Sequence, residues 1–117
     1  MLKNVIILLT VLLTTISASA QQNNVWYFGH RAGLDFNTSG SLPVPRVLSD
    51  GVIETNEGCS SICGSDGKIL FYSNGVTVYN KLHQVMLNGD GLMGNISSVQ
   101  SCIIVPQPGN DSIYYLF

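Results

Sequence analysis

From residue 25 onward, short apolar runs alternate with turn-forming dipeptides, and none repeats with the period of a helix. The dipeptides Asp66-Gly67 and Asn74-Gly75 tolerate the positive φ that tight hairpin turns require, and Asp50-Gly51 is also expected to turn the chain. Pro43 and Pro45 keep an extended connection out of any central ladder. The pattern predicts an all-β chain, with strands at residues 25–28, 34–36, 52–55, 59–63, 69–73, 76–80, 84–86, 102–105 and 113–117.

Consecutive residues of these strands are apolar, so both faces of each strand carry apolar side chains. Ile69 and Phe71 project to one face of a strand, whereas Leu70 and Tyr72 project to the other. A sheet with one solvated face would alternate apolar and polar residues. The four strands expected between residues 59 and 86 therefore form an antiparallel meander that needs cover on both faces, and the runs 102–105 and 113–117 share this character.

The apolar segment at residues 25–28 also aligns with residues 69–72, and these align with residues 113–116 at the same offset of 44. Four-stranded units with a period in the forties are typical of β-propeller blades. About two blades fit in the chain, and propellers close with four or more. We therefore expect the N-terminal part of a longer propeller-like protein, with an ordinary small β-sandwich as the alternative.

The first twenty residues have a different character. Lys3 supplies a positive start, residues 5–16 are uncharged and mostly apolar, and Ala18-Ser19-Ala20 is a small-x-small cleavage pattern. The apolar stretch is shorter than the roughly 20 residues of a membrane-spanning helix. We interpret residues 1–20 as a signal peptide cleaved after Ala20, which leaves residues 21–117 as an exported domain without a membrane span.

The composition of the chain restricts the classes of partner that it could bind. The mature chain carries four basic and seven acidic side chains, and its basic residues are not clustered, which disfavours nucleic acid because phosphate binding requires clustered Lys and Arg. The chain has three cysteines, Cys59, Cys63 and Cys102. Cys59 and Cys63 lie too far apart along one strand to pair with each other. Either could pair with Cys102, and buried free thiols are the alternative.

Several residues could take part in catalysis, and each also has a more ordinary interpretation. His30 near Asp35 could form a base, but a loop histidine is commonly just solvated. Asp50, Glu54 and Glu57 could supply a carboxylate pair for glycoside cleavage, but acidic residues are also common in turns.

Three further segments resemble functional motifs but do not match them fully or have a structural explanation. The segment 58–62 lacks the second glycine of a nucleophile elbow, and the loop 88–91 lacks the acidic ligands that flank a calcium loop. The aromatic residues 26–28 could bind sugar rings, but packing between blades is the stronger reading. The sequence therefore assigns no catalytic, cofactor-binding or metal-binding residue, and we expect no enzyme activity.

Three segments carry a family resemblance. They read VWYFGHRAGLDFN, NEGCSSICGSDGKILFYSNGVTVYNKLHQVM and SVQSCIIVPQPGNDSIYYLF. In this order and spacing, they resemble the amino-terminal region of exported surface proteins of the Bacteroidetes, of the gliding motility-associated or type IX secretion cargo type. The resemblance implies a β-propeller-like domain with a binding role at the cell surface and no established catalytic residues. The carboxy-terminal sorting domain of that pattern does not occur in these 117 residues.

The expected function is an exported binding, adhesion or structural module that forms the first blades of a propeller. Its partners would be an extracellular protein or glycan and the remaining blades of its own chain. One alternative is part of a propeller-based hydrolase whose active site lies in other blades. The other is a self-contained β-sandwich that binds a partner through a strand edge.

Overall fold

The structure is a computed structural model that describes residues 21–38 and 44–117. The predicted signal peptide, residues 1–20, and Pro43 lie outside these residues. The described chain forms eight strands and contains no helix, so the all-β, antiparallel prediction is confirmed. None of the described residues forms a helix long and apolar enough to cross a membrane.

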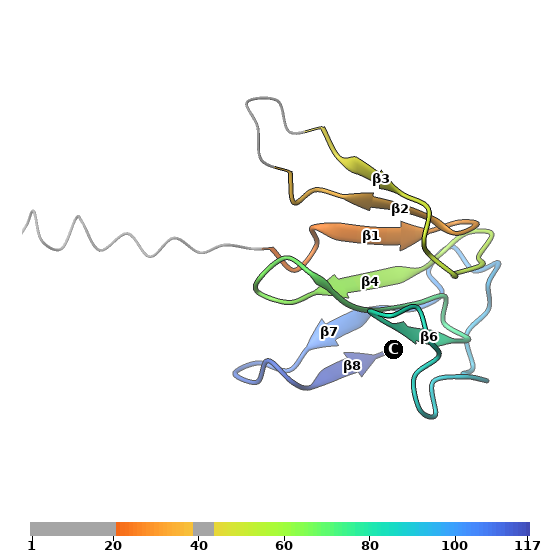
Figure 1. The fold of residues 1–117 in the computed structure, drawn as a ribbon. Helices are drawn as coiled ribbons and strands as arrows, with labels where there is room; N and C mark the ends of the chain where they lie inside the picture. Colours follow the sequence, from red (N-terminus) through yellow and green to blue (C-terminus); the bar gives the residue numbers. More distant parts are fainter. Residues whose placement is uncertain (1–20, 39–43) are drawn as a thin grey trace, which may run out of the picture.

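The strands build three small antiparallel sheets (Figure 1). The first sheet contains β1 (Val25–Phe28), β2 (Ala32–Asp35) and β3 (Arg46–Leu48). The middle sheet contains β4 (Ser60–Cys63), β5 (Ile69–Ser73) and β6 (Val78–Asn80). The last sheet contains β7 (Ile104–Pro106) and β8 (Tyr114–Leu116).

Two predicted strands take a different form. Residues 52–55 make only an isolated bridge between His30 and Glu54, and the third strand of the first sheet is instead Arg46–Leu48. This strand follows Pro45 directly and pairs on the outer edge of β2, where a missing proline N–H costs least. Residues 84–86 are likewise reduced to a bridge between Tyr79 and Val85, after a turn in which His83 has φ 61°.

The core lies between the first and the middle sheet. Its buried side chains are Val25, Tyr27, Ile53, Cys63 and Tyr72. The rings of Tyr27 and Tyr72 stack with their centroids 4.6 Å apart, and Tyr72 stacks in turn on Tyr79. This column of aromatic rings joins the two sheets through apolar contact.

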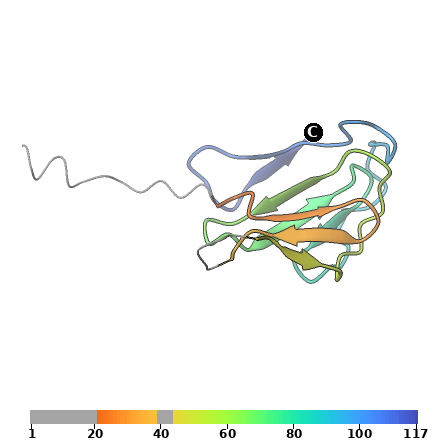
Figure 2. The same ribbon diagram turned by 90° about the horizontal axis from the view of Figure 1, so that it is seen from above.

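The other face of the middle sheet packs against the last sheet. Phe71 contacts Tyr114 edge to face, with their ring centroids 5.4 Å apart, and the buried Cys102 thiol donates to the carbonyl of Ser73. Figure 2 shows the first and last sheets on opposite sides of β4. The middle sheet is thus covered on both faces, as its two-sided apolar sequence predicts.

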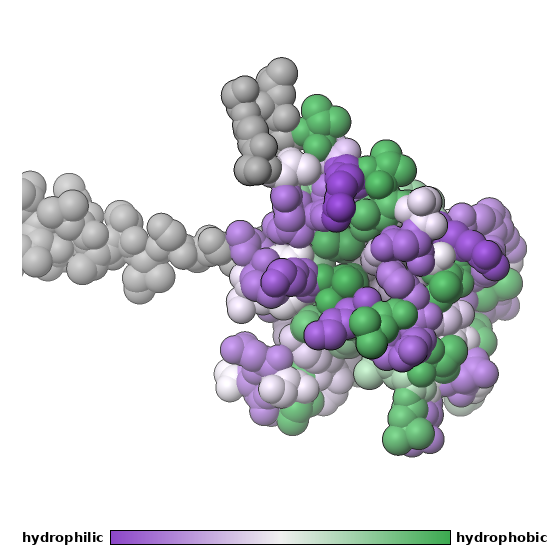
Figure 3. All heavy atoms as spheres, in the orientation of Figure 1, coloured by the Kyte–Doolittle hydropathy of each residue, from purple (hydrophilic) through white to green (hydrophobic). Residues whose placement is uncertain are grey.

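The outward faces of the stack remain apolar. On the first sheet, Trp26 and Phe28 are exposed, and on the last sheet Ile103, Val105 and Tyr115 are exposed. Figure 3 shows hydrophobic side chains at the surface among polar ones. Corresponding strands also recur at the predicted period, since β1 and β5 begin 44 residues apart, at Val25 and Ile69, and β4 and β7 do so at Ser60 and Ile104.

Ile53 tests the importance of the core between the first two sheets. Its side chain is fully buried, so Ile53→Ala should lower the free energy of unfolding by about 2–5 kcal/mol, through lost burial and the cavity left behind. The fully exposed Leu87→Ala should change it by less than about 0.5 kcal/mol. Urea unfolding of both variants measures the difference, and equal effects would contradict this assignment of the core.

Candidate functional site

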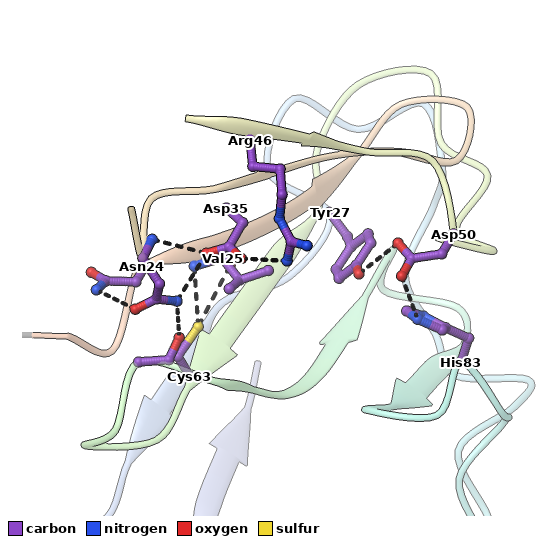
Figure 4. A network of polar contacts seen from close by, with 10 residues as sticks. Asn24, Val25, Tyr27, Asp35, Arg46, Asp50, Cys63 and His83 are labelled. Carbon is purple, nitrogen blue, oxygen red and sulfur yellow. Dashed lines mark hydrogen bonds and ion pairs between the residues drawn. The ribbon is translucent and has the colours of Figure 1, made fainter. Parts of the chain in front are cut away.

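The backbone edge of β1 that does not face β2 forms hydrogen bonds with side chains of β4 rather than with the backbone of another strand. The Ser61 hydroxyl accepts a hydrogen bond from the Tyr27 N–H at 3.0 Å and donates to the Tyr27 carbonyl at 3.3 Å. The Cys63 thiol makes the same pair of contacts with the backbone of Val25, at 3.3 and 3.7 Å (Figure 4). Cys59, directly before β4, adds a second thiol, which donates to the Tyr27 carbonyl at 3.5 Å. Alternate residues along β4 thus satisfy buried backbone groups of β1.

A chain of polar side chains runs along the same interface. The Tyr27 hydroxyl donates to Asp50 Oδ1 at 2.9 Å, and Asp50 Oδ2 lies 3.6 Å from His83 Nε2. On its other side, His83 Nδ1 lies 2.8 Å from the Tyr72 hydroxyl, which the Val52 N–H approaches at 3.4 Å. Figure 4 shows Tyr27, Asp50 and His83 converging at one end of β1.

The environment fixes the protons of this chain. Burial, together with the Asp50 carboxylate, raises the pKa of Tyr27 well above its usual value, and burial also raises the pKa of Tyr72. Both phenols therefore keep their protons and act as donors at neutral pH. The protonated Tyr72 hydroxyl lies within hydrogen-bond distance of His83 Nδ1, and Nε2 on the other side of the ring faces Asp50.

A second charged group lies at the other end of β1. The Asp35 carboxylate accepts a hydrogen bond from Arg46 at 2.8 Å and another from the Asn37 backbone. Partial burial opposes ionisation of Asp35, but these two donors outweigh it and hold its pKa below the usual value. A hollow of about 180 Å³ lies between the two charged groups, with Asp35, Arg46, Asp50 and Lys68 in its wall.

The titratable side chains of this interface contact other groups of the protein. Tyr27, Asp50, His83 and Tyr72 bind one another, and His83 has both ring nitrogens directed at protein groups. The three thiols are free, and burial raises the pKa of each, so they remain protonated rather than reactive thiolates. Among the described residues, no group of three or more His, Cys, Asp or Glu side chains is placed to hold a metal ion.

The candidate catalytic residues of the sequence contact other partners than expected. His30 pairs with Glu54 at 2.7 Å rather than with Asp35, and Arg31 binds the same carboxylate at 2.9 Å. Hydrogen bonds from His30 and Arg31 hold the pKa of Glu54 below its usual value. Asp50 is not joined to Glu54 in an acid–base pair, because it contacts Tyr27 and His83 instead.

Two other candidates have structural contacts. In the loop 88–91, Asp90 accepts a hydrogen bond from the Thr77 hydroxyl at 2.7 Å. Of the aromatic residues 26–28, Tyr27 is in the core, whereas Trp26 and Phe28 face outward beside a hollow of about 440 Å³. Trp26 packs against Phe36, with their ring centroids 4.9 Å apart.

Sequence reasoning missed the polar chain. Tyr72 and His83 belong to the stretch 65–86, which reads as strands and turns without reactive groups, and Asp50 reads as part of a turn. Their contacts span up to 33 positions and depend on how the sheets stack, so no local motif reveals them. Comparison with protein-family models, curated proteins and solved structures gave no match for this chain.

The raised pKa of Tyr27 predicts a pH-dependent contribution to stability. The unfolded chain ionises this phenol near pH 10, but the folded chain keeps it protonated, so its contribution is fully present below about pH 10 and is lost as the pH rises further. Tyr27→Phe should lower the free energy of unfolding by about 1.5–3 kcal/mol below pH 10. Above pH 10 the difference from wild type should narrow, by up to about 1.4 kcal/mol per pH unit.

Urea unfolding of both proteins between about pH 8 and pH 11 measures this difference. The thiols also lose protons in this range, but they are common to both proteins and cancel in the comparison. A difference that stays constant up to pH 11 would show that the folded state does not hold the Tyr27 proton.

Proposed function

We propose that this chain is an exported, non-enzymatic binding module of the cell surface, related to the Bacteroidetes proteins that it resembles, and that its sheets are propeller-like blades. Three stacked sheets and the 44-residue recurrence of their strands support the blade assignment. In such a stack, sheet faces are used for packing, so loops at the ends of strands remain for partners.

The loop between β6 and β7 is the observation that carries the binding role. Leu87, Met93 and Val99 are among the most exposed apolar side chains of the chain, and all three lie on this loop. Exposed apolar groups gathered on one segment mark interaction surfaces. They favour a protein partner over a glycan, because sugar hydroxyls need polar partners that these three side chains lack.

The same loop is held in place by its backbone. The N–H groups of Leu92 and Gly94 donate to the carbonyls of Val76 and Gly75, and Asn56 donates to the carbonyl of Ile96. Gly94 is required here because a side chain at this position would collide with the carbonyl of Gly75. A loop that is anchored in this way presents its apolar side chains with little loss of entropy on binding.

The binding role is tested with the exported protein, whose N-terminus is expected at Gln21. The protein is immobilised and exposed to fibrinogen, mucin and a soluble polysaccharide. We expect saturable binding to at least one of the two proteins, weakened at least about tenfold by the double change Leu87→Ser and Met93→Ser, because lost hot-spot contacts typically cost over 1 kcal/mol. Lys81→Ser, on the same loop, is the matched control.

Two outcomes count against the proposal. Binding that is unchanged by the double variant would remove the loop from the interface. Turnover of nitrophenyl ester or glycoside substrates by the exported protein would instead support the hydrolase alternative.

A further inference from the structure

The sheets of the stack contact one another through a repeated aromatic position. Tyr27, Phe71 and Tyr115 follow one another at intervals of 44 residues. Tyr27 packs on Tyr72 of the next sheet at 4.6 Å, and Phe71 packs on Tyr114 of the sheet after that at 5.4 Å. This position therefore directs an aromatic ring toward the following sheet in both interfaces of the stack.

The third member of the series faces outward. Tyr115 is 45% exposed, and Val105, its partner across the β7–β8 ladder, is 40% exposed. Directly opposed residues in a ladder project to the same face, so Tyr115 and Val105 form one apolar surface on the outside of the last sheet. Within the described residues, no further sheet covers it.

The first sheet carries, on its outward face, the position that corresponds to a ring contacted by the preceding sheet. Phe28 precedes Tyr72 by 44 residues, and Tyr72 is the ring that receives Tyr27. Phe28 and Trp26 are 36% and 46% exposed, and the hollow of about 440 Å³ beside them lies between β1 and residues 59–61. The first sheet thus presents an exposed aromatic surface, with no sheet ahead of it in the described residues.

We propose that a second copy of this chain covers these faces, so that the last sheet of one copy packs against the first sheet of the next. Such a contact would continue the interfaces inside the chain, where the repeated aromatic position meets a ring of the following sheet twice, Tyr72 in one case and Tyr114 in the other. The two surfaces differ from each other, so the contact is head to tail and can continue to further copies. The loop between β6 and β7 approaches the last sheet, because Met93 lines one hollow with Leu116 and Phe117, whereas Leu87 is not among the residues that line it.

The test measures the mass of the exported protein in solution by light scattering over a wide range of concentration. Phe28→Asp blocks the first sheet and Tyr115→Asp blocks the last. Wild type should grow in mass as its concentration rises, and each variant alone should remain a monomer. An equimolar mixture of the two variants should form a dimer and nothing larger, because one intact surface of each kind remains.

Leu87→Asp on the binding loop is the matched control and should associate as wild type does. Circular dichroism melts establish that each variant folds, and Phe28→Ser and Tyr115→Ser, expected to weaken association at least tenfold, replace any aspartate variant that does not.

Wild type that stays monomeric at every concentration would overturn the proposal and assign the faces to sheets of a longer chain or to another partner. Variants that still associate alone, or that fail to pair when mixed, would overturn it as well. Leu87→Asp changes the loop without changing either face, so loss of binding with normal association, or the reverse, shows which of the two proposals fails.

Discussion

The fold depends on how the edge of β1 is satisfied. Val25 and Tyr27 are buried, and their N–H and carbonyl groups point away from β2. Left without partners, each such group would cost about 1–3 kcal/mol. Ser61 and Cys63 supply these partners from the side chains of β4, so the first sheet joins the middle sheet without strand-to-strand pairing. This joint allows separate sheets to stack as layers.

Stacking then determines what the rest of the molecule can do. It brings the ring of Tyr27 onto that of Tyr72 and completes the polar chain through Asp50 and His83. The titratable groups of the interface therefore contact one another. It also directs apolar side chains outward from the first and last sheets and leaves the loop after β6 at the surface.

The sequence predicted the architecture well where local signals suffice. The bounds of β1 and β5 match their apolar runs, and the two-sided apolar pattern of β5 correctly indicated a covered sheet. The strand Arg46–Leu48 was missed because the preceding prolines read as a connection, whereas the ladder only excludes proline from its interior.

The candidate site could not be derived in the same way. In a strand sequence, a serine normally indicates only a small polar side chain, and a cysteine a possible disulfide partner. Ser61 and Cys63 become hydrogen-bond partners of the β1 backbone only because the tertiary fold places β4 beside β1. His83 sits in a turn with a left-handed backbone, far from Asp50 in sequence, so its role also follows from packing alone.

Amide hydrogen exchange tests the joint between β1 and β4 most directly. The Tyr27 amide, held by the Ser61 hydroxyl, should exchange as slowly as amides in the ladder between β4 and β5. Ser61→Ala should speed exchange at Tyr27 while the β4–β5 amides stay protected. Exchange of the Tyr27 amide at the rate of an open loop in the unchanged protein would contradict this account.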